Sequence, residues 1–311
     1  MPARMSASAP IDHLLDQPLG YPTADPAPSQ HPTRVAMSFE VIPPRNEDDA
    51  SRLDNLLDTL AQYNPDYVAV TSSQRSGWLE GTARFIERIS TTTNMRPLAH
   101  LACTAGPVHE LSGWIDRLVD SGVRGLLALR GDLPPGEDRL PPGYLPHADS
   151  LVRLIRQRES EQLARLAAGR IAVGVACYPN GHSESANTEE DFDVLLAKQR
   201  LGADFAITQL FFDAEDYLRF LQRARLAGVR IPLIPGIMPV TTPARLERMS
   251  QLSGIPVPDR LRQRLESNPD SGLEITVELA RACLEGGAPG LHLYTHNDAP
   301  LTTEIMQRLG V

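Results

Sequence analysis

Candidate catalytic residues of this chain lie at the ends of short apolar runs. The run Leu126–Leu129 is followed by Arg130, Gly131 and Asp132, so a cation and an anion flank a glycine. Glycine can adopt backbone angles that a side chain forbids, which makes this a flexible joint. Taken alone, the stretch could be a surface turn in which Arg130 pairs with Asp132. Several other apolar runs end in polar residues in the same way, and this favours a shared site.

Glu40 is the most unusual of these residues because it lies inside the apolar stretch Met37–Ile42. Burial of an ionised carboxylate is costly, so we expect the pKa of Glu40 to rise unless a cation lies nearby. A carboxyl group with a raised pKa can act as a general acid near neutral pH. The alternative is a structural salt bridge.

Asp132 and Gln209 could recognise a heterocyclic ring. Asp132 follows a glycine in a loop and should remain ionised, which suits an amidine-like ring edge or a developing cation. Gln209 offers a donor and an acceptor, as the edge of a pterin requires, although it could instead cap its own loop. Other polar residues near the ends of apolar runs say little alone: Thr71, His100, Tyr178, His182 and Tyr294. No spacing typical of metal ligands and no Ser-His-Asp set is evident, so we predict no metal site.

The elements that must position these residues alternate between strands and helices. Most of the predicted strands are apolar throughout, as expected for parallel strands covered on both faces. Eight strands alternating with helices predict a single (β/α)8 TIM barrel, whose chemistry lies at the C-terminal ends of its strands. An open doubly wound sheet is the alternative, but its Gly-x-Gly-x-x-Gly turn is absent after the first strand. The predicted strands are Val35–Val41, Tyr67–Val70, Pro97–Cys103, Gly125–Leu129, Ile171–Cys177, Phe205–Thr208, Ile231–Ile234 and Leu291–Leu293.

Composition narrows the class of protein. The net charge of −9 argues against nucleic acid as a partner, and no apolar run is long enough to span a bilayer. The three cysteines are far apart in sequence, which suggests reduced thiols and a cytoplasmic, soluble protein. Residues 1–33 are rich in Pro, Ala, Ser and Asp and predict a flexible arm, with one helical turn at Ile11–Gln17. The barrel is then expected over residues 34–311.

Several motifs, taken in order, resemble those of the methylenetetrahydrofolate reductase family from about Arg34 to Val311. The resemblance implies a single barrel that reduces 5,10-methylenetetrahydrofolate to 5-methyltetrahydrofolate with a nicotinamide donor, NADH or NADPH. The motifs are Ser38–Arg45, His100-Leu101, Leu129–Pro135, Tyr178-Pro179, Ile207–Asp213 and Ile234–Pro239.

The resemblance also implies roles for individual residues. Glu40 is the acid that helps to open the imidazolidine ring, Asp132 contacts the pterin and favours the cationic iminium, and Gln209 holds the substrate. Further substrate contacts are expected from Tyr294 and Thr71. Cofactor contacts are expected from His100, Arg130, Tyr178, His182, Asp191 and Lys198.

Departures from the family pattern fall mainly on its flavin site. Ser72-Ser73-Gln74 replaces an aromatic or similar residue followed by Gly-Ala, and Val194 stands where flavin-binding members often carry Asn. Ala197 stands where they carry an Arg that meets the cofactor's phosphates, His147 near an expected Tyr, and Asp298 near an expected basic residue. We therefore predict direct hydride transfer from NAD(P)H without flavin. The alternative is that FAD is held through altered contacts.

Two rival functions remain open at this point. A pterin-dependent methyltransferase has the same fold and would need an acceptor or corrinoid partner, but the acid Glu40 disfavours it. A folate-binding or regulatory protein could have kept the pterin contacts and lost redox activity. Recognition of NADH would separate the reductase from such a binder.

Overall fold

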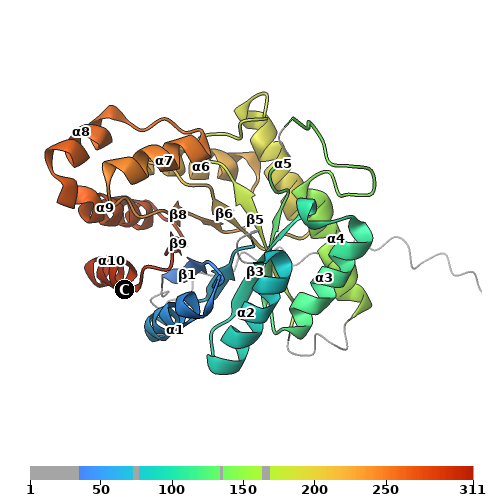
Figure 1. Cartoon of the computed structure of the whole chain (residues 1–311). Coiled ribbons are helices and arrows are strands. Elements are labelled where there is room, and N and C mark those ends of the chain that lie inside the picture. Colours follow the sequence, from blue (N-terminus) through green and yellow to red (C-terminus); the bar gives the residue numbers. More distant parts are fainter. Residues whose placement is uncertain (1–34, 73–76, 134–135, 163–168, 311) are drawn as a thin grey trace, which may run out of the picture. The chain divides into compact units, whose positions relative to one another are not determined.

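The computed structural model describes residues 35–72, 77–133, 136–162 and 169–310, which form an α/β barrel of parallel strands (Figure 1). The predicted barrel is confirmed. The predicted N-terminal arm and its helical turn lie outside the described residues. Within the described part, no helix is long and apolar enough to cross a membrane.

The elements alternate along the chain as predicted, and most boundaries agree with the sequence pattern. After the fourth strand the sequence pattern predicts a long helix over about Ala148–Ala168. The structure has this helix over Ala148–Glu161, and residues 163–168 lie outside the described residues. The strands are β1 (Ala36–Val41), β2 (Tyr67–Val70), β3 (Pro97–Ala102), β4 (Gly125–Leu129), β5 (Ala172–Cys177), β6 (Phe205–Thr208), β7 (Leu233–Ile234), β8 (Gly236–Ile237) and β9 (Gly290–Tyr294). The α-helices are α1 (Glu47–Gln62), α2 (Trp78–Thr92), α3 (Val108–Asp120), α4 (Ala148–Glu161), α5 (Thr188–Arg200), α6 (Ala214–Ala227), α7 (Pro243–Ser253), α8 (Asp259–Ser267), α9 (Gly272–Glu285) and α10 (Ala299–Leu309).

The predicted seventh strand, Ile231–Ile234, is shorter in the structure, and a second short strand that was not predicted, β8, follows it after Pro235. The sheet runs β7-β6-β5-β4-β3-β2-β1-β9-β8, so β7 pairs with β6 and β8 pairs with β9. Pro235 separates the two strands because it has no N–H to donate to a neighbouring strand. Its carbonyl still accepts a hydrogen bond from the backbone N–H of His292 at 3.0 Å. The two strands together close the barrel between β6 and β9.

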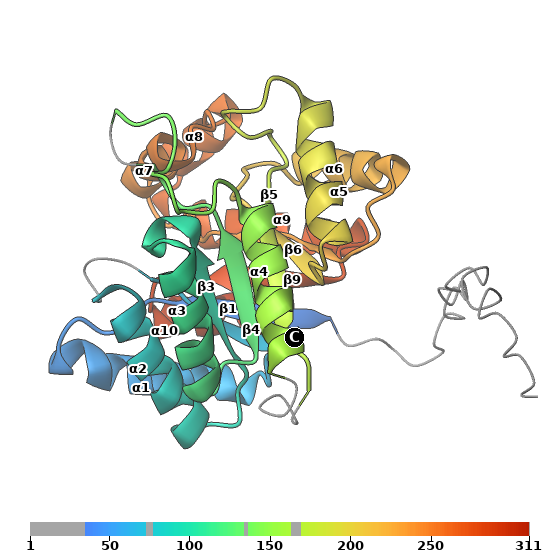
Figure 2. The ribbon, with the colours of Figure 1, turned by 90° about the vertical axis from the view of Figure 1, so that its right-hand side faces the viewer.

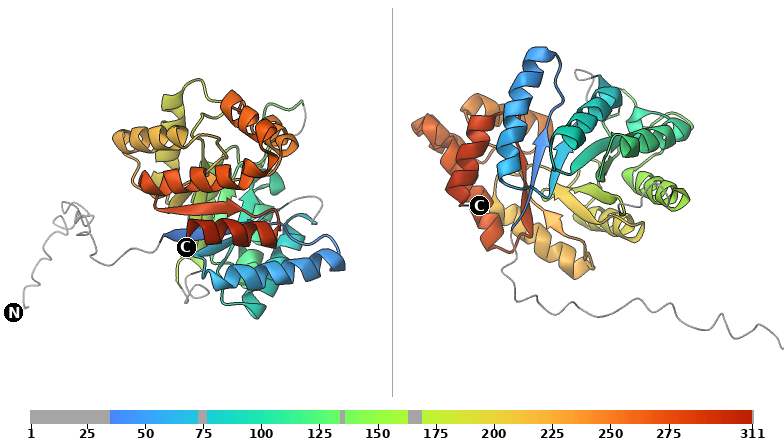
Figure 3. Two further views of the ribbon diagram at one scale, coloured as in Figure 1. Left: turned by 90° about the vertical axis from the view of Figure 1, so that its left-hand side faces the viewer. Right: turned by 90° about the horizontal axis from the view of Figure 1, so that it is seen from below.

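The core lies on both sides of the strands. Phe39, Val70 and Leu101 are fully buried, and the helices form a layer outside the ring of strands (Figures 2 and 3). Apolar residues on both faces explain why the strands read as continuous apolar runs. The cysteines, which are Cys103, Cys177 and Cys283, are free and buried.

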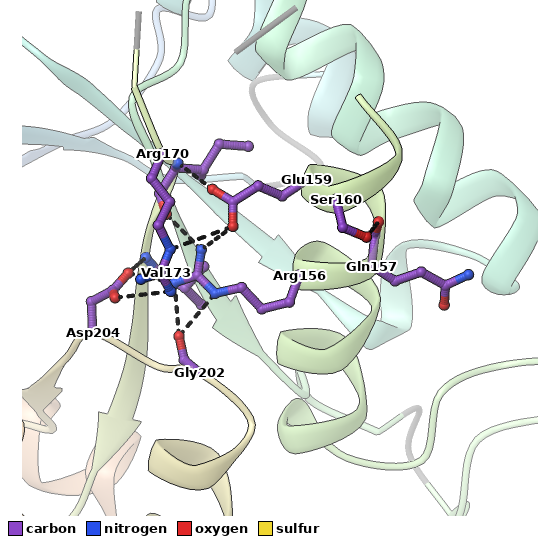
Figure 4. A network of polar contacts seen from close by, with 9 residues as sticks. Arg156, Gln157, Glu159, Ser160, Arg170, Val173, Gly202 and Asp204 are labelled. Atoms are coloured by element: carbon purple, nitrogen blue, oxygen red, sulfur yellow. Dashed lines mark hydrogen bonds and ion pairs between the residues drawn. The ribbon is translucent and has the colours of Figure 1, made fainter. Parts of the chain in front are cut away.

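A polar network joins α4 to the N-terminal ends of β5 and β6 (Figure 4). The Arg156 guanidinium donates to the carbonyl of Gly202 at 2.7 Å and to the Glu159 carboxylate at 2.8 Å, and it pairs with Asp204. The same two carboxylates accept from backbone N–H groups of the strand region, Glu159 from Ile171 and Asp204 from Val173, both at 2.7 Å. Buried charges are tolerated when they are paired and hydrogen-bonded in this way. The network therefore fixes α4 against the base of the barrel.

Candidate active site

The C-terminal ends of the strands surround a cavity of ≈ 840 Å³, which we call the mouth. This volume is typical of a pocket for small molecules. Thr71 does not join the other predicted residues there, because Ser72 lines the mouth in its place. The carbonyl of Thr71 instead accepts a hydrogen bond from the Thr82 hydroxyl of α2 at 2.9 Å. The predicted site residues that line the mouth are Glu40, His100, Arg130, Asp132, Tyr178, His182, Gln209 and Tyr294.

Glu40 faces two histidines across the barrel interior. Its Oε2 atom lies 3.4 Å from Nε2 of His100 on β3 and 3.7 Å from Nε2 of His292 on β9. Nδ1 of His292 lies 2.9 Å from the Ser38 hydroxyl, which is also 3.4 Å from the carbonyl of Leu291. If Ser38 donates to Nδ1 of His292 rather than to this carbonyl, the proton of this imidazole is on Nε2, which then faces the Glu40 carboxylate. The Glu40 carboxylate thus lies within ion-pair distance of two imidazoles.

The exception attached to the expected rise in the pKa of Glu40 applies, because two imidazoles lie beside its carboxylate. Burial acts to raise the pKa of Glu40, but its interaction with His292 and the positive charge that His100 carries when protonated act in the other direction, and the net shift is downward. Burial also lowers the pKa of His100, although Glu40 opposes this shift. Both groups therefore favour their deprotonated forms near neutral pH.

Asp132 is placed by a backbone conformation that only glycine adopts readily. Gly131 has φ +84°, and a Cβ atom there would lie 2.1 Å from the Thr104 hydroxyl. Asp132 then extends, exposed, into the mouth. The alternative pairing with Arg130 is not seen, because the Arg130 guanidinium binds the Glu184 carboxylate through two N–H groups, one at 2.7 Å. Asp132 thus presents a carboxylate that no described cation pairs with.

Gln209 and Tyr294 line neighbouring parts of the mouth. The Gln209 side-chain oxygen accepts from the backbone N–H of Leu210 at 2.9 Å, so it caps its own loop and leaves its amide N–H groups to a ligand. The Tyr294 hydroxyl donates to the carbonyl of Thr208 at 3.2 Å, and burial raises its pKa far above the usual value. Gly236 permits this packing, because a Cβ atom there would lie 2.8 Å from the Tyr294 hydroxyl.

A second cleft of ≈ 320 Å³ adjoins the mouth between α4 and α5 and shares Arg130, Tyr178 and His182 with it. Asp191 and Lys198, predicted as cofactor contacts, lie here. The Lys198 ammonium donates to the carbonyl of Ala176 at 3.1 Å, and burial lowers its pKa. The Asp191 carboxylate accepts from the Ser185 hydroxyl at 2.7 Å.

Most charged groups of this cleft contact other groups of the protein. The Arg and Lys side chains that line it are already engaged by protein groups, and Glu184 adds a negative charge beside Arg130. A diphosphate needs free cations or free N–H groups. Val194 and Ala197 of α5 line the same cleft and supply neither.

Sequence reasoning missed four residues of the site. Ser38, Trp78 and Glu184 gave no signal, since a serine in a strand, a tryptophan at a helix start and a glutamate in a loop are common. His292 stands inside the apolar run Leu291–Leu293 and is 1% exposed. The same argument that singled out Glu40, a titratable residue within an apolar strand, could have found it.

Comparisons with known proteins agree with this geometry. The model of the family "Methylenetetrahydrofolate reductase" matches residues 28–310. The 5,10-methylenetetrahydrofolate reductase of Escherichia coli (strain K12) is 31% identical over 285 residues, which cover 89% of this chain and 92% of that protein. A methylenetetrahydrofolate reductase (NADH) 1 of Arabidopsis thaliana is 28% identical over 296 residues, covering 89% of this chain and 49% of that protein.

Solved structures support the fold alone. A mutant tryptophan synthase α-subunit from Pyrococcus furiosus superposes with a TM-score of 0.52 at 12% identity, over 89% of this chain and 98% of that one.

Proposed function

Since this chain belongs to the methylenetetrahydrofolate reductase family, an oxidoreductase family, we propose that it passes a hydride directly from NAD(P)H to 5,10-methylenetetrahydrofolate. In this proposal no flavin carries the electrons. The observation that carries it is the pairing of Arg130 with Glu184 at the place where a cofactor phosphate would need a free cation.

The reaction begins with opening of the imidazolidine ring. The product carries its methyl group on N5, so the bond between the bridging carbon and N10 is the one that breaks. Glu40, with His100 and His292 beside it, delivers a proton to N10 as this nitrogen leaves. General acid catalysis of this kind contributes about a hundred- to ten-thousand-fold in rate. The electron pair of N5 then forms a cationic iminium with the bridging carbon.

The iminium carbon is the hydride acceptor. C4 of the nicotinamide ring transfers its hydride to that carbon, which gives the N5-methyl product and oxidised dinucleotide. Asp132 places an exposed carboxylate in the mouth, where it lowers the energy of the cation. Electrostatic stabilisation of a charged transition state by one such group is worth about 3 kcal/mol. The Gln209 amide N–H groups hold the pterin edge.

The absence of a flavin is supported by the second cleft rather than by the mouth. A resident cofactor needs strong phosphate contacts because it remains bound through many turnovers. Arg130 and Lys198 are occupied by Glu184 and Ala176, and the exposed Val194 offers no polar contact. A dinucleotide that enters and leaves at each turnover can bind more weakly in the mouth beside folate.

The test combines a spectrum with initial-rate kinetics, and NADH is used because the Arabidopsis relative is named for it. The purified protein should lack flavin absorbance, and added FAD should not raise the rate. Direct transfer requires both substrates to be bound together, so double-reciprocal plots should intersect. Yellow protein with stoichiometric FAD and parallel lines would contradict direct transfer. If the purified protein binds folate but does not reduce it with NADH, the protein is a folate binder rather than a reductase.

A further inference from the structure

Trp78, the first residue of α2, is exposed at the rim of the mouth. Its side chain is 60% exposed, and it lines the mouth together with Ser72 and the buried Leu79. Single apolar residues on a surface are normal and need no explanation. A large aromatic ring on the wall of a substrate cavity is a different case, because it offers a flat face to whatever the cavity binds.

The backbone at Trp78 is strained. Its φ is +53°, in the left-handed region that bulky residues rarely adopt, and it follows Gly77 with φ +79°. Strain of this kind persists only where surrounding contacts hold it, and it is concentrated at functional sites. The fully buried Thr82 supplies such a contact, since its hydroxyl donates to the carbonyl of Thr71 and lies 3.2 Å from that of Trp78. The indole is therefore carried by a fixed helix start at the end of β2.

The chemistry of ring opening says which group lies near this wall. N10, the nitrogen that Glu40 protonates in the proposed function, is bonded to the p-aminobenzoyl ring of folate. A carboxyl group that protonates N10 contacts that nitrogen, so the p-aminobenzoyl ring must lie close to Glu40. Glu40 pairs in register with Ala69 of β2, and the connection from β2 leads to Trp78. The helix that follows this strand in the chain thus begins with an exposed aromatic ring that lines the same cavity as Glu40.

We propose that Trp78 stacks on the p-aminobenzoyl ring of the folate substrate. The inference rests on the proposed function in one respect, the delivery of the proton from Glu40 to N10. Stacking between aromatic rings needs no charge and no exact hydrogen-bond geometry, and it positions the substrate without entering the reaction. Trp78 is thus a positioning residue for the aryl half of folate, while Gln209 and Asp132 act on the pterin half. The nicotinamide dinucleotide is the rival occupant, and the test separates the two.

Fluorescence can report on Trp78 alone, because the chain has only two tryptophans. Trp114, on α3, packs against the core with Arg117 over its ring at 5.5 Å. In the Trp114→Phe variant, 5-methyltetrahydrofolate and p-aminobenzoylglutamate should quench the emission of Trp78 saturably. 6-Methyltetrahydropterin, which lacks the aryl ring, and NAD⁺ should not. The Trp78→Phe variant, in which Trp114 remains, corrects for absorbance by the ligands.

Kinetics supply the second readout. Trp78→Ala should raise KM for methylenetetrahydrofolate about tenfold, because stacking is lost equally from the ground state and the transition state. The value of kcat and KM for NADH should stay within about twofold. Trp78→Phe should restore most of the folate affinity, and Trp114→Phe should match the parent. Circular dichroism confirms that each variant is folded.

Two outcomes would overturn the proposal: an unchanged KM for folate in folded Trp78→Ala, or a rise in KM for NADH instead. Failure of the proposed function is recognised separately, because it appears in the parent protein as flavin absorbance or parallel kinetic lines. Quenching of Trp78 by the aryl ligands does not depend on how the hydride travels.

Discussion

The barrel carries a polar cluster at each end, and the two clusters differ in how completely their charged groups are hydrogen-bonded. At the base, Arg156 donates to carboxylates and carbonyls, and those carboxylates also accept backbone N–H groups. At the mouth, Glu40 meets His100 and His292 at 3.4 and 3.7 Å, and Nε2 of His100 has no hydrogen-bond partner among the described residues. The charged groups at the base are therefore all paired or hydrogen-bonded, whereas those at the mouth lack some of their hydrogen-bond partners.

This difference indicates what each cluster contributes. A network in which every charged group is paired holds helices and strands together. Residues at the N-terminal face of such barrels generally serve stability. An unsaturated cluster can bind a proton, lose it and regain it at little cost, which is what acid catalysis requires. Substitutions at the base should therefore change the free energy of unfolding, and substitutions at the mouth should change the rate.

The largest effect is expected for Glu40→Gln. The amide keeps the shape of the side chain but cannot donate an acidic proton, so kcat for folate reduction should fall about a thousandfold. The thermal unfolding temperature should change little, because the carboxylate has no saturated network to lose. Steady-state kinetics and thermal unfolding measure the two quantities. Near-normal turnover over the accessible pH range would remove Glu40 from the role of acid.

Arg156→Met should show the opposite behaviour. It leaves Glu159 and Asp204 without their main cation, so the free energy of unfolding should fall by about 3 kcal/mol, as when a buried ion pair is broken. The kcat of the folded protein should be unchanged. Arg308→Met is the matched control, since Arg308 pairs with Glu304 on the surface of α10. There the loss should be about 0.4 kcal/mol. Equal urea midpoints for the two variants would contradict the assigned role of the base.

Asp132→Asn tests the role of the second carboxylate at the mouth. The amide preserves hydrogen-bonding atoms but removes the charge that lowers the energy of the iminium, so kcat should fall about a hundredfold. KM for folate should change by less, because the ground state carries no such cation. A rise in KM with unchanged kcat would make Asp132 a binding group only.

The pH dependence of kcat/KM should follow from the direction of the pKa shifts. The pKa values of Glu40 and His100 both lie below their usual values, so the cluster lacks its acidic proton near neutral pH. Lowering the pH supplies that proton, and kcat/KM should rise by up to about tenfold per unit as the pH falls from about 8 to 6. The Glu40→Gln variant should lack this dependence. A flat or rising profile with increasing pH would contradict it.

The strands and most helices could be predicted because their signals are local. Tyr67–Val70, Gly125–Leu129 and Phe205–Thr208 agree in both boundaries, since each apolar run is bounded by polar or turn residues. The division at Pro235 had a local signal, the missing N–H, but the strand beyond it became visible only through its pairing with β9.

The charges of the site could not be paired from sequence. Arg130 pairs with Glu184, which is 54 residues away, rather than with Asp132, which is two residues away. The pKa of Glu40 was expected to rise unless a cation lay nearby, and the sequence did not show that His100 and His292 would lie beside it. Both cases have one cause: the sequence shows which residues reach the mouth, but not which side chains meet there.

The most direct measurement of the central claim follows the hydride itself. NADH carrying deuterium at the transferred position of C4 is mixed with methylenetetrahydrofolate in ordinary water, and the methyl group of the product is analysed by mass spectrometry. Direct transfer predicts one deuterium in each N5-methyl group. A reduced flavin holds the transferred hydrogen on a nitrogen that exchanges with water. A product methyl group that contains only solvent hydrogen would therefore contradict the account.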